Sequence, residues 1–164
     1  MKFELTLYTV LVFLVPGSLS VGVLRFWSHA VDELAAGLLS SPTAVNAALV
    51  TAAAFGLGAM VDSLRTLAID PLVSWLGKTG TPPNYLAKLT SVNLPVFEFV
   101  LRRTHEYYRF NANTAFALLL LSVSCFRTVG LSLPSFASAA AFLLFLWGAV
   151  RQQKASFWAM ERFH

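Results

Sequence analysis

The chain has 164 residues, of which 57% are hydrophobic and only 12% are charged, with a net charge of +4 and a mean hydropathy of +0.66. Soluble domains carry about 25% charged residues, so this chain has too few charges to cover a water-facing surface. The composition excludes a soluble enzyme, a disordered tail and a disulfide scaffold, and it favours an integral membrane protein. The lone cysteine, Cys125, cannot form an internal disulfide.

Four apolar segments are long enough to cross a bilayer, whose hydrocarbon core of about 30 Å needs about 20 helical residues. The predicted spans are at about residues 5–25, 41–61, 110–126 and 134–150. We interpret the first as a retained membrane helix, because its apolar run is too long for the core of a cleaved signal peptide. The predicted fold class is therefore all-α integral membrane, with four transmembrane helices in a single membrane domain over residues 1–164.

The segment between the second and third spans, residues 62–109, is the largest piece outside the predicted membrane region. Its first part is largely apolar and is expected to continue the second helix, and residues 77–83 are rich in Gly and Pro and predict a turn. From Asn93 onward, Pro95 is tolerated in a first helical turn and no later breaker occurs before Gly130. The third span is thus expected to extend into the cytoplasm as one long helix, and residues 26–40 are expected to include a short surface helix.

Lysine and arginine are distributed unevenly between the two sides of this topology. Ten of the twelve fall at the N-terminus, in residues 62–109 or at the C-terminus, whereas only Arg25 and Arg127 fall on the other side. Cytoplasmic loops carry an excess of basic residues. We therefore expect a multi-pass protein of the cell membrane with both termini in the cytoplasm.

Pro16 and Gly17 interrupt the middle of the first span. Proline removes one helical hydrogen bond and leaves the carbonyl four residues earlier, that of Val12, without its partner. In lipid such a carbonyl needs another donor, and Ser18 and Ser20 are near enough to contribute. The pair predicts either a hinge or kinked pore lining, or a kink that serves packing.

Small residues recur at helical spacing in the second and fourth spans, where they allow helices in lipid to approach closely. The stripes predict tight helix contacts, either within one subunit or between subunits of a homo-oligomer. The residues that we expect to pack in this way are Ala52, Gly56, Ala59, Ala137, Ala141 and Gly148.

Charged residues gather at two places beside the predicted spans. Asp62 and Arg65 lie one turn apart at the end of the second span and form a predicted interfacial charge pair, either an anchor or part of an ion path. Arg102, Arg103, His105 and Arg109 precede the third span, on the long helix. They predict binding either to anionic lipid headgroups or to a cytoplasmic protein or nucleotide-like ligand.

The apolar runs that define the four spans contain no acidic or basic residue, the first run ending just before Arg25, and this argues against a proton- or sodium-coupled transporter. No catalytic constellation is evident: the histidine in residues 105–109 lacks the second histidine of a zinc-protease helix. The three histidines fall on different sides of the predicted topology, so we predict no metal site and no cofactor. We expect a protein that is not an enzyme.

Two resemblances bear on function. The stretch from Arg103 to Asn111, with Glu106 and Arg109, resembles the signature of the four-span membrane-associated eicosanoid and glutathione metabolism proteins, and this implies a glutathione-type transferase. The overall plan, with its kink at residues 16–17 and its basic helix at 102–109, resembles the small four-helix membrane subunits of bacterial antiphage systems such as Kiwa and Hailong. That resemblance implies an oligomeric assembly in the bacterial inner membrane that works with a cytoplasmic partner.

We therefore expect a homo-oligomeric integral membrane protein, a gated ion-conducting pore or membrane effector that receives a cytoplasmic signal or partner, with a role in antiphage defence. The alternatives are a glutathione-type transferase and a passive membrane anchor for a larger complex. Oligomeric state separates these hypotheses first, because a ring of four or more chains favours a pore and a trimer favours the transferase.

Overall fold

The computed structural model describes residues 7–40, 43–78 and 94–162, with side chains over 10–40, 43–78 and 102–158. The described residues form five helices and no strand, which confirms the all-α fold. Four of the helices, all except α2, are long and apolar enough to cross a membrane. The helices are α1 (Leu7–Trp27), α2 (His29–Ser40), α3 (Ala44–Gly77), α4 (Leu94–Val129) and α5 (Leu133–Arg162).

The long helices extend beyond the predicted spans. α3 continues without a break from the predicted second span through Asp62 to Gly77, and Lys78 caps it in the left-handed conformation with φ 51°. α4 is a continuous helix of 36 residues, as the absence of breakers predicted, and α5 continues past Arg151. α2 is the short helix expected in residues 26–40. Most of the turn predicted at 77–83 lies outside the described residues, as do residues 5–6 and 41–42 of the predicted spans.

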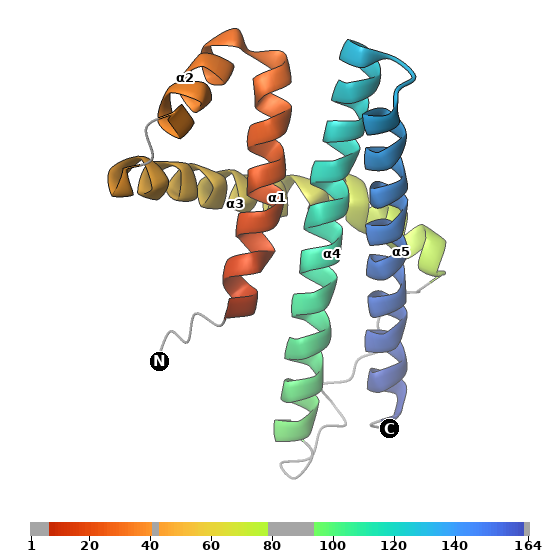
Figure 1. The fold of residues 1–164 in the computed structure, drawn as a ribbon. Helices are drawn as coiled ribbons and strands as arrows, with labels where there is room; N and C mark the ends of the chain where they lie inside the picture. Colours follow the sequence, from red (N-terminus) through yellow and green to blue (C-terminus); the bar gives the residue numbers. More distant parts are fainter. Residues whose placement is uncertain (1–6, 41–42, 79–93, 163–164) are drawn as a thin grey trace.

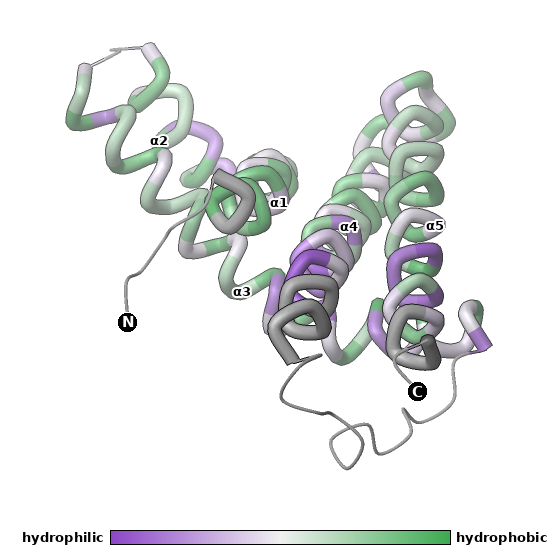
Figure 2. The backbone as a smooth tube through the Cα atoms, turned by 90° about the horizontal axis from the view of Figure 1, so that it is seen from below, coloured by the Kyte–Doolittle hydropathy of each residue, from purple (hydrophilic) through white to green (hydrophobic). Residues whose placement is uncertain are grey.

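The helices form a bundle-like arrangement in which α3 crosses the other long helices (Figure 1). α4 and α5 are an antiparallel pair joined at Gly130, and α1 lies beside α4. α2 folds back from the end of α1 toward the start of α3, on the side of α1 opposite to α4 (Figures 1 and 2). With 34 residues, α3 is about 51 Å long, so it can cross a core of about 30 Å even when strongly tilted.

The backbones of α1 and α3 touch where two glycines meet. A Cβ atom added to Gly17 would lie 1.6 Å from the carbonyl oxygen of Ala54, and one added to Gly58 would lie 1.9 Å from that of Phe13. No side chain larger than hydrogen fits at either position. Gly17 therefore serves the α1–α3 contact directly, next to the proline that disturbs the helix.

The small-residue stripe predicted on the second span faces the other way. Ala52, Gly56 and Ala59 are exposed, and a Cβ added to Gly56 would have nothing within 4 Å. The contact with α1 uses Ala54 and Gly58, two residues further along, because two residues correspond to about 200° around a helix. The predicted stripe thus does not form the close contact with α1, and its residues are exposed in the single chain.

On α5 the three predicted packing residues have different surroundings. Gly148 packs against α4, because an added Cβ would lie 3.2 Å from the side chain of Asn111. Ala141 is half-buried and Ala137 is exposed. The hydrophobic core lies where α3, α4 and α5 meet and contains Ile69, Val73, Ala112, Ala115, Leu146 and Ala149.

Candidate functional site

Two acidic and two basic side chains meet between the second half of α3 and the middle of α4. Together with one tyrosine they form what we call the ionic cluster, which consists of Asp62, Arg65, Asp70, Tyr108 and Arg109. Figure 2 shows the hydrophilic part of α4 next to α3 at this level. Ionisable residues in membrane helices are rare and are by default candidates for function.

Helical spacing on α3 turns Arg65 into the interior. The buried face of α3 repeats every three or four residues, as expected for one side of a helix, and Arg65 lies between Val61 and Ile69 on it, with only 5% of its surface exposed. Its guanidinium donates to both carboxylates of its own helix, from Nε to Asp62 Oδ1 at 3.1 Å and from Nη1 to Asp70 Oδ1 at 2.5 Å. A buried charge is tolerated because it is paired in this way.

α4 completes the cluster with two consecutive residues. Arg109 binds Asp62 through two hydrogen bonds, one from Nε to Oδ1 at 3.3 Å and one from Nη2 to Oδ2. The Tyr108 hydroxyl donates to Asp70 Oδ1 at 2.5 Å, and the Arg65 guanidinium lies 5.4 Å from the centre of the Tyr108 ring. The paired Arg–carboxylate geometry fixes the relative position of α3 and α4.

The first span reaches the cluster as well. The guanidinium of Arg109 lies 5.3 Å from the ring centre of Phe13, within the distance of a cation–π contact. Asn113, one turn beyond Arg109 on α4, donates from Nδ2 to the carbonyl oxygen of Val12 at 3.3 Å. The cluster therefore joins α3 and α4 and contacts α1 at Phe13, about one turn before Pro16.

The Val12 carbonyl is the one that Pro16 frees. The sequence suggested Ser18 and Ser20 as donors for it, but these hydroxyls donate to the carbonyls of Leu14 and Pro16 instead. The donor to Val12 comes from α4, 101 positions away in the sequence. The carbonyl freed by Pro16 is thus bound to α4, one turn beyond Arg109 of the ionic cluster.

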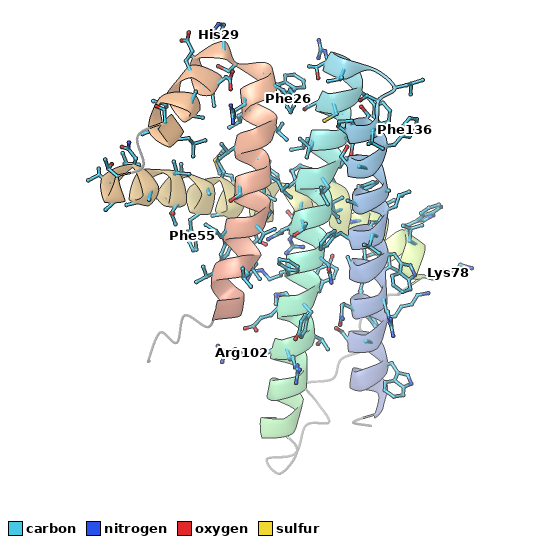
Figure 3. The ribbon with its side chains drawn as sticks, viewed as in Figure 1. Phe26, His29, Phe55, Lys78, Arg102 and Phe136 are labelled. Atoms are coloured by element: carbon cyan, nitrogen blue, oxygen red, sulfur yellow. The ribbon has the colours of Figure 1, made fainter. Side chains whose placement is uncertain are left out.

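The predicted basic stretch does not gather at one place. Arg102 pairs with Glu106 on its own helix, with Nε to Oε1 at 3.4 Å, and Arg103 lies 5.9 Å from the Tyr107 ring centre. His105 is exposed. Figure 3 shows Arg102 on the part of α4 that lies beyond the crossing with α3. These residues form a surface on α4, whereas Arg109 belongs to the ionic cluster.

Sequence reasoning identified three of the cluster residues and missed Asp70 and Tyr108, together with Asn113. A usable signal was present: three ionisable residues, Asp62, Arg65 and Asp70, occur within nine positions of an otherwise apolar helix. The pairing itself was not readable, because Asp62 and Arg109 are 47 residues apart. The interfacial charge pair Asp62–Arg65 exists as an ion pair, but both residues also have partners elsewhere.

Over the described residues, no group of three or more His, Cys, Asp or Glu side chains is placed to hold a metal ion. Two residues behind the resemblance to glutathione-metabolising proteins are engaged within the chain, Glu106 with Arg102 and Arg109 with Asp62. No protein-family model, no curated protein and no solved structure matches this chain. The fold and site define a multi-pass, all-helical class of protein with four candidate membrane spans.

Proposed function

We propose that this protein is a homo-oligomeric membrane effector that conducts ions when a cytoplasmic signal or partner acts on α4. The observation that carries the proposal is the pair between Arg109 and Asp62. Arg109 belongs to the same helix as Arg102, Arg103 and His105, one to two turns further along. A ligand that displaces α4 therefore acts on the Arg109–Asp62 pair, which holds α4 to α3.

The proposed mechanism depends on the ionic cluster, which connects α3 with α4. Breaking the Arg109–Asp62 pair leaves two partly buried charges without full compensation, which is costly and drives rearrangement. α3 is bound at the same time to α1 through the crossing at Gly17 and Gly58. A shift of α3 relative to α4 is thus transmitted to the kinked first span, and packed interfaces of this kind change between discrete arrangements.

In this proposal, oligomerisation builds the path for ions. The exposed small-residue face of α3, with Ala52 and Ala59, suits close packing against a second copy in lipid. Hydroxyl and small residues on the long helices could then line a path without fixed charge. The resemblance to antiphage membrane subunits extends the proposal to bacterial defence, with both termini in the cytoplasm.

The test is potassium efflux from liposomes that contain the purified protein, with ATP or inorganic phosphate as probes on the cytoplasmic face. Asp62→Asn is expected to raise efflux without a probe, because it weakens the closed arrangement. Glu33→Gln is the matched control, since it neutralises an exposed acidic residue that pairs with His29 on its own helix. Equal efflux from wild type and Asp62→Asn, both at the level of empty liposomes, would refute the pore.

Reception of the signal is tested separately. Changing Arg102 and Arg103 together to Gln is expected to abolish the response to a probe while leaving the Asp62→Asn efflux intact. An unchanged response would remove the sensing role of this surface. A trimer whose melting temperature rises with millimolar glutathione would favour the transferase instead, and a monomer without conductance would favour a passive anchor.

A further inference from the structure

A second site lies on the other side of α1 from the ionic cluster. α1, α2 and α3 enclose a cleft of about 470 Å³, lined by apolar side chains that include Val21, Leu34, Leu38 and Ala53, with Arg25 as its only charged residue. Figure 1 shows that α2 folds back from the end of α1 toward the start of α3. A volume of this size falls within the range of small-molecule sites, about 300–1,000 Å³.

A recess of about 260 Å³ adjoins the cleft and is lined by Gly22, Arg25, Phe26 and Asp32. Arg25 lines both spaces, so an apolar compartment and a charged compartment meet at one side chain. Arg25 Nε donates to Asp32 Oδ1 at 2.7 Å, but these side chains are 40% and 50% exposed. Such an exposed pair contributes little to stability, so an incoming anionic group can replace Asp32 as the partner of Arg25.

We propose that this site binds one membrane phospholipid, with an acyl chain in the cleft and the phosphate at Arg25. The apolar lining excludes a polar ligand from the cleft, and the adjoining ion pair matches a head that carries a phosphate and an amine. A helix of a second copy, about 10 Å in diameter, would fit only about one turn in 470 Å³. A slender hydrocarbon chain fits the space, and lipid surrounds the candidate spans.

A substitution at Gly56 can place a larger side chain in the cleft. It lines the space, and a Cβ added to it would meet nothing within 4 Å, so a larger side chain can enter without displacing backbone. Gly37 on α2 also has nothing within 4 Å of an added Cβ but does not line the cleft. Gly56→Phe and Gly37→Phe are therefore a matched pair with the same added bulk.

The experiment uses the full chain in liposomes of phosphatidylethanolamine that contain a small fraction of the same lipid with a diazirine on its acyl chain. After illumination, mass spectrometry maps the labelled peptides. In the wild type the label is expected on residues 29–40 and 50–57. Gly56→Phe is expected to lower that labelling roughly tenfold, the equivalent of 1.4 kcal/mol of binding, whereas Gly37→Phe keeps it.

Three results would overturn the proposal. One is equal labelling of these peptides in wild type and Gly56→Phe. Another, which needs no variant to fold, is wild-type label confined to outward-facing side chains such as Leu143 and Trp147, which are 60% exposed. The third is labelling by a diazirine fatty acid but not by the phospholipid, which would reassign the site to free fatty acids.

Variants of Arg25 test separately whether this residue binds the phosphate. Arg25→Gln is expected to lower phospholipid labelling, and Arg25→Lys is expected to restore much of it, because the positive charge is what faces the phosphate. Unchanged labelling in Arg25→Gln would contradict the assignment of the phosphate to this residue. The site is independent of ion conduction, so its failure leaves the proposed function untouched.

Discussion

The side-chain amide of Asn113 on α4 donates a hydrogen bond of 3.3 Å to the carbonyl oxygen of Val12 on α1. In a regular helix that carbonyl would accept a hydrogen bond from the N–H of the residue four positions later, but this residue is Pro16, which has no N–H. The proline in α1 and the packing of α4 are therefore linked, because a buried amide replaces a missing helical hydrogen bond. Asn113 is fully buried, so water cannot take its place.

A double-mutant cycle tests this relationship. Pro16→Ala restores an N–H for Val12, so Asn113→Leu is expected to cost about 1 kcal/mol more in the wild-type background than in Pro16→Ala. The coupling is measured from unfolding free energies in detergent micelles. The cycle is more informative than Asn113→Leu alone, because that change also removes a buried amide oxygen that has no hydrogen-bond partner in the described structure. Additive effects would contradict the hydrogen bond.

The α1–α3 crossing predicts that Gly→Ala substitutions differ strongly in their effect on stability. Gly17→Ala and Gly58→Ala are each expected to destabilise the fold by about 3 kcal/mol or more, because the new methyl group would overlap a backbone carbonyl. Gly22→Ala, on the same helix as Gly17, meets nothing within 4 Å and is expected to be neutral or stabilising by up to about 1 kcal/mol. Thermal melting followed by tryptophan fluorescence compares them, and equal melting temperatures would show that the two helices do not touch there.

The ionic cluster predicts non-additive effects on stability. Asp62→Asn is expected to cost about 2 kcal/mol or more, because it leaves Arg65 and Arg109 without their shared carboxylate. Adding Arg109→Gln to Asp62→Asn is expected to cost less than Arg109→Gln costs alone, since the pair is already broken.

Arg102→Gln is the control for the cluster variants, because its pair with Glu106 is on the surface, with 71% of the Arg102 side chain exposed. A change within about 0.5 kcal/mol is expected. If Arg102→Gln destabilised the protein as much as Asp62→Asn, the ionic cluster would contribute no more to stability than an ion pair on the surface.

The exposed face of α3 predicts the interface between subunits. Ala52→Leu and Ala59→Leu together are expected to lower the oligomeric state in nanodiscs, measured by native mass spectrometry, without lowering the melting temperature of the subunit, since both side chains are exposed in one chain. Ala137→Leu makes the same change at an exposed position of α5. If only Ala137→Leu disrupted the oligomer, the subunits would associate through α5.

The proposed orientation is open to chemical labelling in intact cells. Cys125 is buried, so a Cys125→Ser background is expected to preserve the fold and to give no label. Lys78→Cys is expected to react with an impermeant maleimide only after the cells are opened, and His29→Cys is expected to react at once. The reverse pattern would place the termini outside the cytoplasm.

The sequence by itself determined the all-helical fold and the four helices that are long and apolar enough to cross a membrane. Hydropathy alone marks the apolar segments, because a helix in lipid must satisfy its own backbone and present apolar side chains. The continuous α4 from Leu94 was also predictable, since no breaker follows Pro95 before Gly130. That Pro16 leaves the Val12 carbonyl without its helical partner was predictable for the same local reason.

Only the tertiary structure decided which faces of these helices meet. Apolar residues occur on every side of α3, so neither its buried face nor its crossing of α1 at Gly58 could be read from periodicity. The equally small residue Gly56 has nothing within 4 Å of an added Cβ. The same holds for Arg65 and Arg109, whose shared partner Asp62 depends on contacts between helices far apart in the sequence. Local chemistry fixes where a helix begins, bends and ends, whereas the pairing of charges and the fit of backbones depend on how whole helices pack.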